Sequence, residues 1–318
     1  AALCLGAVVC SSEIGRWPMS KPAKIPKPPD ENDKKRMQGS DYDPMGELVE
    51  LHPEQPTARP SGKPKSQAAA MLALFEAHHG EAFRSLDDRP LFCLTEGGRR
   101  QTMQLPPAVK ALARWHYLQT GQPATARSRE EVRNHLEALA EAGPKRQTWL
   151  RVAEHDGALY LDLGDDSWRV VRIASEGWDV IDCPPVYFVR PGAMLPLPVP
   201  VHGGNVAELF ELVNIPTGPD RALALAWLVS TLRPSRTFPI LALHGEQGSA
   251  KSTTAEMLAT VIDPHRAGVR IRPKDEETVM VATQNAWVLA YDNLSSMPPW
   301  LSALSSQATS HARERRLM

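Results

Sequence analysis

The chain has 318 residues, of which 42% are apolar, so it is long enough for two domains or one large domain with a proper core. Its formal net charge of −1 excludes a bulk attraction to nucleic acid and confines any DNA-binding surface to a local patch. The four cysteines form no C-x-x-C pair, so neither a zinc site nor a disulfide framework is expected, and a cytoplasmic location is predicted. No apolar run approaches the roughly 20 residues of a transmembrane helix, so no membrane contact is expected.

Residues 1–65 are predicted to be a disordered segment rich in proline and charge. Most of this segment lacks a periodic apolar pattern and cannot bury enough surface to offset its ordering entropy. Its first ten residues, AALCLGAVVC, are apolar but have no basic stretch before them. They are interpreted as a fragment or a mis-called start, in preference to the tail of a signal peptide.

Residues 66–148 are predicted to form a small α/β accessory region. A helix is expected to begin with Ser66 as its N-cap, because apolar residues then recur on one face. Short strands are expected at 91–94 and 102–105, followed by two further helices. The second of these helices is predicted to open with a capping box at 128–131.

Residues 149–200 are predicted to form an antiparallel β-meander followed by a proline-rich connector. The alternating runs end at turn signals, and Asp156-Gly157 suits a tight hairpin. Three nearby carboxylates could suggest a metal site, but they are interpreted as turn residues between strands. They are Asp162, Asp165 and Asp166.

Residues 201–318 are predicted to form the C-terminal domain. A helix is expected after Asn205, and another begins at Pro219 with a run that is apolar nearly all round and therefore expected to be buried. The sequence FPILALHGEQGSAKSTT then reads as an apolar strand, a glycine-containing turn and a helix start. This order matches the phosphate-binding loop G-x-x-x-x-G-K-[ST], except that Ala250 stands at the last glycine position.

The chemistry of this motif favours ATP with Mg²⁺. Gly245 and Gly248 allow backbone N–H groups to face phosphate oxygens, and the helix N-terminus adds positive charge. Lys251 is expected to reach the β- and γ-phosphates, and Ser252 to ligate Mg²⁺. The predicted nucleotide-binding residues are Gly245, Glu246, Gln247, Gly248, Ser249, Ala250, Lys251, Ser252 and Thr253.

A second acidic element follows about 40 residues later, at a spacing that suits a Walker B strand. The sequence AWVLAYDN at 286–293 is an apolar strand ending in Asp292, whose carboxylate is expected to hold Mg²⁺ beside Ser252. A strand at 268–271 and a helix at 275–284 are expected before it. A strand that ends in aspartate is a weak signal alone, and the preceding phosphate-loop motif strengthens it.

From about Ser66 to Ser302 the chain resembles the primase–helicase-like ATPases of phages and integrated mobile elements, relatives of the superfamily 3 helicases in the AAA+ class. Two stretches carry the resemblance most specifically, HGEQGSAKSTT and WVLAYDNLSSMPPWLS, and the meander WLRVAEHDGALYLDLGDDSWRVV and the connector PVYFVRPGAMLPLP add to it. It implies an AAA+-like parallel sheet, a homo-oligomeric ring and ATP-driven translocation on single-stranded DNA. Lys251 and Ser252 match the Walker A pair and Asp292 the Walker B residue.

Two departures from the family pattern bear on catalysis. Asn293 stands where many such ATPases have a second acidic residue that activates water, and an amide orients water but accepts a proton poorly. The residues from about 303 onward match neither the sensor strand nor the arginine finger expected of a ring helicase, so the ATPase sheet is predicted to be incomplete by truncation or frameshift. The arginines of this tail are interpreted as a solvated basic end.

The sequence therefore predicts the ATP-binding domain of a helicase/primase-type replication ATPase, with Lys251, Asp292 and Asn293 as its catalytic positions. The intact parent is expected to hydrolyse ATP. This chain is expected to bind ATP but not to hydrolyse it efficiently. Two alternatives stay open. One is a DNA- or partner-binding module whose phosphate loop is a remnant, and the other is a nucleotide-dependent regulatory switch.

Overall fold

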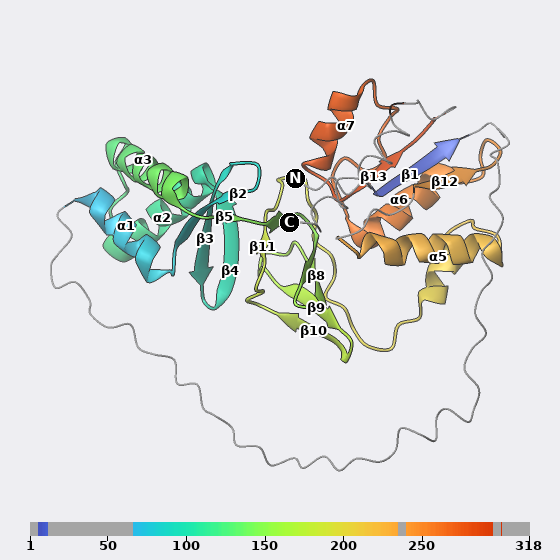
Figure 1. The fold of residues 1–318 in the computed structure, drawn as a ribbon, viewed down its shortest axis with the longest axis horizontal. Helices are drawn as coiled ribbons and strands as arrows, with labels where there is room; N and C mark the ends of the chain where they lie inside the picture. The colour runs from blue at the N-terminus through green and yellow to red at the C-terminus, as the bar shows by residue number, and fades with distance from the viewer. Residues whose placement is uncertain (1–5, 12–65, 235–239, 295–299, 301–318) are drawn as a thin grey trace, which may run out of the picture. The chain divides into compact units, whose positions relative to one another are not determined.

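The structure, a computed structural model, describes the backbone of residues 6–11 and the full residues 66–234, 240–294 and 300. These residues form a mixed α/β structure with four sheets in the described part of the chain (Figure 1). The prediction of mixed α/β structure is thus confirmed. The predicted disorder of residues 12–65 and the unusual tail after 303 lie outside the described residues.

The accessory region is a four-stranded sheet with helices packed on it (Figure 1). Its strand order is β4-β3-β2-β5. Its elements are α1 (Gln67–Ala77), β2 (Glu81–Ser85), β3 (Pro90–Glu96), β4 (Arg99–Gln104), α2 (Leu105–Thr120), α3 (Ala126–Ala142) and β5 (Lys145–Arg146). Met71, Phe92, Leu112 and Leu136 are fully buried between the helices and the sheet, as their apolar spacing requires. Ser66 caps α1 as predicted, because its Oγ accepts the N–H of Ala69.

The predicted capping box of the third helix is wrong by three residues. Thr125 is the N-cap of α3, and its side chain accepts the N–H of Ser128. Both residues are good caps, and the hydroxyl that lies nearest the first free N–H groups takes the position. The helix therefore begins one turn before the predicted capping box.

The predicted meander is confirmed as a four-stranded antiparallel sheet in the order β10-β9-β8-β7. Its strands are β7 (Val152–His155), β8 (Ala158–Asp162), β9 (Val170–Ala174) and β10 (Gly177–Ile181). Asp156 and Gly157 form the tight hairpin with φ of 48° and 76°, the positive values that such a two-residue turn requires. Beside it, β6 (Thr148–Trp149) pairs in parallel with β11 (Tyr187–Phe188).

The C-terminal part contains a three-stranded parallel sheet in the order β12-β1-β13 (Figure 1). Its elements are β1 (Gly6–Ser11), η2 (Val206–Glu208), α4 (Leu209–Leu212), α5 (Pro219–Thr231), β12 (Leu241–His244), α6 (Lys251–Ile262), α7 (Glu276–Thr283) and β13 (Val288–Tyr291). Ala255, Leu258 and Ile262 of α6 form its core with residues of α5 and β13.

Strand β1 corrects the prediction that the whole of residues 1–65 is disordered. Val8 pairs with Leu241 on one side and with Ala290 on the other, so β1 is the middle strand of the sheet. Its sequence, GAVVCS, contains the β-branched residues that favour strands. The apolar start of the chain was too short a signal to identify a pairing with strands more than 200 residues away.

Two further expectations for the C-terminal part need correction. Helix α5 is not buried all round, because Leu223 is 64% exposed and Val229 is 55% exposed. Only the face that carries Ala224, Trp227 and Leu228 packs on the core. The helix therefore has more apolar side chains than this face can bury. The strand expected at 268–271 is reduced to a single parallel bridge between Arg270 and Tyr291.

Among the described residues, no helix is long and apolar enough to cross a membrane.

Candidate functional site

The loop between β12 and α6 has a strongly turned backbone. We call residues 245–250 the glycine loop. Gly248 has φ of 83°, and Ala250, the N-cap of α6, has φ of 60°. The missing glycine of the sequence motif is therefore replaced by alanine in a left-handed conformation, which costs an L-residue roughly 1–2 kcal/mol. A Cβ at Gly245 would lie 2.8 Å from Ser249 Oγ, so the serine side chain would have to rotate away.

Lys251 turns its ammonium group back over the glycine loop. Its Nζ donates to the carbonyl oxygens of Gly245 at 2.9 Å and Glu246 at 2.6 Å. It also lies 3.4 Å from Ser249 Oγ. A lysine ammonium is a compact charge with three donors that can move from carbonyl to phosphate oxygens. Together with the N-terminus of the 12-residue helix α6, it makes the loop electropositive, and these groups fit a bound phosphate chain.

Ser252 and Asp292 meet at the carboxyl end of the parallel sheet. Ser252 Oγ donates to Asp292 Oδ2 at 2.7 Å, although 40 residues separate them in sequence. The other carboxylate oxygen, Oδ1, accepts the N–H of Asn293 at 2.8 Å. A hydroxyl and a carboxylate are hard oxygen donors that suit Mg²⁺, which usually takes one or two protein ligands and completes its shell with water and phosphate. Within the described ranges no group of three or more His, Cys, Asp or Glu residues could hold a metal.

A buried ion pair fixes the strand that delivers Asp292. Arg151 Nε donates to Asp263 Oδ1 at 2.9 Å, and both side chains are at most 1% exposed. Asp263 follows α6 directly, and its Oδ2 accepts the N–H groups of Trp287 at 2.6 Å and Val288 at 3.2 Å. One carboxylate therefore ties the end of α6 to the beginning of β13, while Ser252 and Asp292 meet at the opposite ends of the same two elements.

The remaining predicted site residues are exposed to solvent. Glu246 and Gln247 are exposed in the glycine loop, and Thr253 is exposed on α6, next to the buried Thr254. Asn293 is exposed and has φ of 57°, a conformation that asparagine tolerates better than most residues. The structure thus joins Ser252 to Asp292, with Lys251 next to Ser252 in the chain, and leaves Asn293 exposed beside Asp292.

A cavity of about 350 Å³ adjoins the glycine loop and β12, and sequence reasoning missed its other wall. That wall comes from the turn before α5 and from the first turns of α5 itself. It is lined by Asn214, Ile215, Pro216, Asp220, Leu223 and Ala224. Asn214 Nδ2 donates to the Ser249 carbonyl at 3.1 Å, so this wall is bonded to the loop. The only sequence signal was a polar residue just before the Ile-Pro pair, which is common in ordinary turns.

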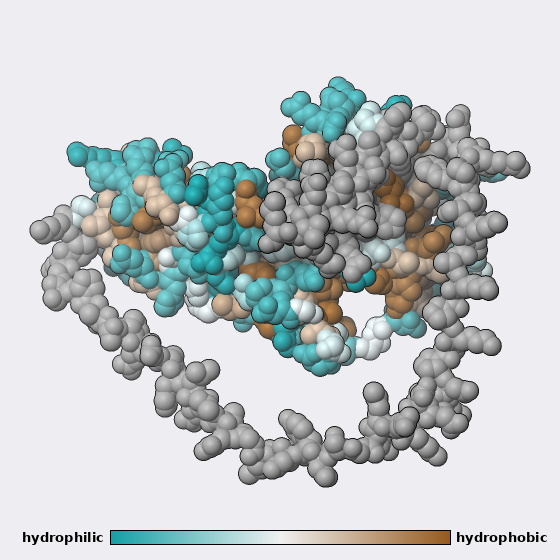
Figure 2. All heavy atoms as spheres, viewed as in Figure 1, coloured by the Kyte–Doolittle hydropathy of each residue, from teal (hydrophilic) through white to brown (hydrophobic). Residues whose placement is uncertain are grey.

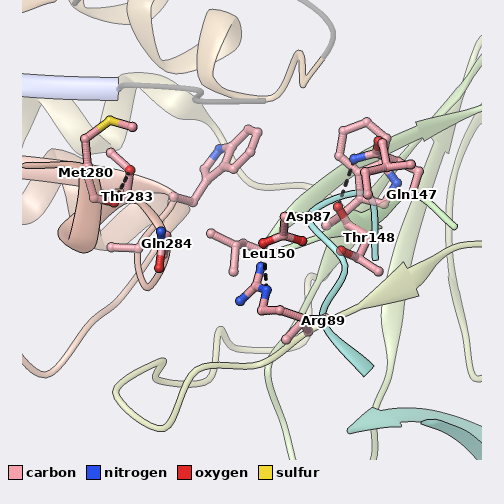
Figure 3. A pocket seen from close by; sticks show the side chains of 13 residues that line it. Asp87, Arg89, Gln147, Thr148, Leu150, Met280, Thr283 and Gln284 are labelled. Atoms are coloured by element: carbon pink, nitrogen blue, oxygen red, sulfur yellow. Dashed lines mark hydrogen bonds and ion pairs between the residues drawn. The ribbon is translucent and has the colours of Figure 1, made fainter. Parts of the chain in front are cut away.

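Figure 3 shows a second cavity, of about 270 Å³. Three contacts join labelled residues of its lining. Asp87 and Arg89 form an ion pair at 2.7 Å, Gln147 Nε2 donates to the Thr148 carbonyl at 3.0 Å, and Thr283 Oγ1 donates to the Met280 carbonyl at 2.7 Å.

The three meander carboxylates do not form a metal cluster. Asp162 is buried and accepts Arg190 Nε at 2.8 Å, and Asp165 accepts Arg169 Nε at 2.7 Å. Asp166 follows in the turn before Trp168. Two of the three carboxylates are thus neutralised by arginine, and the ion pairs explain them without a metal.

Comparison with known proteins relates the part of the chain that holds this site to replication proteins. Residues 206–315, less than half of the chain, match the family model described as actinomycete integrative conjugative element replication protein. This range includes the glycine loop, Lys251, Ser252 and Asp292, and it extends past Ser302, where the sequence resemblance described above ends.

A curated relative shows weaker similarity. It is described as a putative ribose/galactose/methyl galactoside import ATP-binding protein of Pseudomonas fluorescens, and it is 32% identical over 92 residues. The alignment covers 28% of this chain and 17% of the relative, so the chain spans less than a fifth of the length of that protein. No solved structure matches. The chain is thus similar, over limited regions, to a mobile-element replication family and to an ATP-binding protein.

Proposed function

We propose that this chain binds ATP through the glycine loop and belongs to a helicase- or primase-type replication ATPase of a mobile element. The single observation that carries the proposal is the 2.7 Å hydrogen bond between Ser252 and Asp292. It joins the helix start beside a phosphate-loop motif to the end of an apolar strand, at the carboxyl edge where parallel sheets bind ligands. The family match over residues 206–315 supports the replication role.

In this proposal each residue has a defined task toward the nucleotide. The backbone N–H groups of the glycine loop and the α6 N-terminus bind phosphate oxygens, and the Lys251 ammonium leaves its carbonyl partners to contact the terminal phosphates. Ser252 and Asp292 would hold Mg²⁺, which when bound neutralises charge on the phosphates. The preorganised pair needs little rearrangement to do so.

Asn293 bears on the expected rate of ATP hydrolysis. It follows Asp292 directly and is exposed, so its side-chain amide has access to water. An amide can orient a water molecule by hydrogen bonding but cannot take its proton at neutral pH. We therefore propose that ATP binding is the main activity of this chain and that its hydrolysis is slow.

The proposed partners follow from the replication family and not from a visible surface. Single-stranded DNA is the proposed polymer substrate, and a ring of identical subunits the proposed assembly of the intact parent. The formal net charge of −1 requires that DNA contact be local. The domain limits 66–148, 149–200 and 201–318 are part of this proposal, and strand β1 (Gly6–Ser11) adds the middle strand to the sheet of the last domain.

The test is a calorimetric titration of ATP with Mg²⁺ into the full chain and two lysine variants. Lys251→Ala is expected to weaken ATP binding at least about tenfold, because a charge-assisted contact to phosphate is lost. Lys274→Ala is the matched control, because Lys274 is an exposed lysine outside the cavity and the glycine loop. Equal affinity of both variants, or no binding by the unmodified chain, contradicts the proposal. A steady-state ATPase assay with and without single-stranded DNA tests the DNA partner, and an unchanged rate counts against it.

A further inference from the structure

The cavity in Figure 3 is formed by segments that are far apart in the sequence. They are the turn between β2 and β3, the region of β6 with the residue after β11, and the end of α7 with the turn before β13. Its volume of about 270 Å³ is larger than the roughly 150 Å³ of an engineered cavity that holds benzene, and smaller than the roughly 300–1,000 Å³ of drug-sized sites. This size suits a ligand of one or two fused rings. The larger apolar residues of its lining are Leu86, Trp149, Leu150, Val189, Met280 and Trp287.

The two tryptophan walls of this cavity are held in place by hydrogen bonds within the protein. The Trp287 indole Nε1 donates to the Thr231 carbonyl at 2.8 Å, and the Trp287 backbone N–H donates to Asp263 Oδ2 at 2.6 Å. The Trp149 carbonyl accepts the N–H of Val189 at 2.8 Å, which joins two residues of the lining. Because these walls are fixed before a ligand arrives, binding needs little further ordering of the protein.

The turn between β2 and β3 supplies hydrogen-bond donors to the cavity. Arg89 Nε pairs with Asp87 Oδ2 at 2.7 Å, and Asp87 Oδ1 accepts the Ser85 hydroxyl at 2.6 Å. Within the ranges that the structure describes, the two terminal nitrogens of Arg89 make no hydrogen bond. Their N–H groups can therefore donate to a ligand. Since Asp87 already offsets the guanidinium charge, a neutral acceptor such as a carbonyl oxygen suits this position better than a second anion.

Leu86, in the same turn, is a large apolar side chain that is 43% exposed although it lines the cavity. Figure 2 shows that the visible surface of the accessory region is mostly hydrophilic, with hydrophobic residues in small patches. In the cavity, Leu86 is grouped with the half-buried Trp149 and Leu150. Apolar surface that lines a concave site gains free energy when a ligand covers it, in proportion to the area removed from water.

We propose that this cavity binds a neutral, planar aromatic molecule of one or two fused rings that carries a carbonyl oxygen. The rings pack among Leu86, Trp149 and Trp287, and the carbonyl accepts an N–H from Arg89. The cavity shares no lining residue with the cavity beside the glycine loop. It is therefore a second small-molecule site, and its occupation does not depend on ATP binding.

The experiment titrates two matched probes calorimetrically into the full chain, naphthalene carboxamide and naphthalene carboxylate. They have the same rings, and only the carboxylate is charged. The carboxamide is expected to bind with a Kd below about 1 mM, which a ligand of this size can reach. The carboxylate is expected to bind at least about tenfold more weakly, because Asp87 repels a second anion.

Two substitutions test the position of the carboxamide. Leu86→Trp fills the cavity and is expected to weaken its binding about tenfold or more. Leu139→Trp is the matched control, because Leu139 is 39% exposed and does not line the cavity. Arg89→Met removes the donors without adding bulk and is expected to weaken binding about tenfold, through the loss of a charge-assisted hydrogen bond.

Each contrary result overturns a stated part of the proposal. No saturable binding of the carboxamide below about 1 mM refutes the site. If Leu86→Trp and Arg89→Met both bind the carboxamide like the unmodified chain, the probe lies elsewhere and the cavity assignment is wrong. Loss of carboxamide binding in Lys251→Ala, or on saturation with ATP, would place the probe at the glycine loop and also refute the assignment. Equal affinity for the two probes refutes the preference for a neutral acceptor.

Discussion

In the proposed function, Asn293 is the residue that permits ATP binding and slows ATP hydrolysis. It lies beside the Asp292 carboxylate, with its N–H donated to Asp292 Oδ1, and its own side chain is a neutral amide. Its φ of 57° lies in the left-handed backbone region, which asparagine adopts at a lower free-energy cost than glutamate. The position therefore combines access to water with a conformation that suits the residue present.

Replacing Asn293 by glutamate is expected to raise the ATP hydrolysis rate about tenfold or more, because a carboxylate can take a proton from water in the transition state. The affinity for ATP is expected to change little, and the free energy of unfolding to fall by about 1 kcal/mol from the left-handed backbone. Phosphate release at saturating ATP measures the rate. Asn293→Gln is the control, because it lengthens the side chain but keeps the amide, and equal rates for the two variants would refute a general-base role at this position.

The glycine loop shows how much of the site the sequence motif predicts. The motif pointed to the loop, to the cation and to the helix start, all of which the structure places at 245–252. The departure at Ala250 was visible in the sequence, and the structure gives it the same left-handed backbone that a glycine would take freely. Local spacing predicts these features because they depend on neighbouring residues only. The Asn214 wall depends on a contact 35 residues away and had no such signal.

At the level of elements, the site depends on how α6 and β13 are held together. Ser252 at the beginning of α6 contacts Asp292 just after the end of β13. Asp263, just after the end of α6, accepts hydrogen bonds from N–H groups at the beginning of β13. Arg151 of the segment before β7 neutralises Asp263 from a fully buried position and also donates to the Leu195 carbonyl at 2.9 Å. Sequence periodicity predicted α6, α7 and β13, but it could not predict a charge pair that is 112 residues apart.

Removing the cation of this pair is expected to be strongly destabilising. Arg151→Met leaves the Asp263 carboxylate buried without its partner, which typically costs about 3–5 kcal/mol in the free energy of unfolding. Arg172→Met is the matched control, because the Arg172–Asp179 pair has a similar length of 2.8 Å but side chains that are 41% and 47% exposed. Such an exposed pair contributes about 0–1 kcal/mol. Urea unfolding of both variants measures the difference, and similar losses would show that Arg151 does not act through burial.

At the scale of the whole molecule, the sheet that carries the site is assembled from distant parts of the chain. The strand that leads to the glycine loop and the strand that ends before Asp292 are not neighbours, because β1 lies between them and pairs with both. Ser11, the last residue of β1, is in register with His244, which directly precedes Gly245. The strands predicted near residues 240 and 290 are present as β12 and β13. The distance between them in the sheet is set by β1, which lies in a segment predicted to be disordered from its composition. Pairings of such high sequence separation leave no local pattern to read.

Truncation of the chain tests this arrangement. A chain that begins at residue 12 lacks β1, and we expect it to bind ATP at least about tenfold more weakly, because β12 and β13 lose the backbone hydrogen bonds that set their distance. A chain that begins at residue 6 retains Gly6–Ser11 and is the matched control, expected to bind ATP as the full chain does. Both are titrated with ATP and unfolded with urea. If the two truncated chains bind ATP equally well, Lys251 and Asp292 must be held together without β1, and α6 with its Asp263 contacts would be sufficient to form the site.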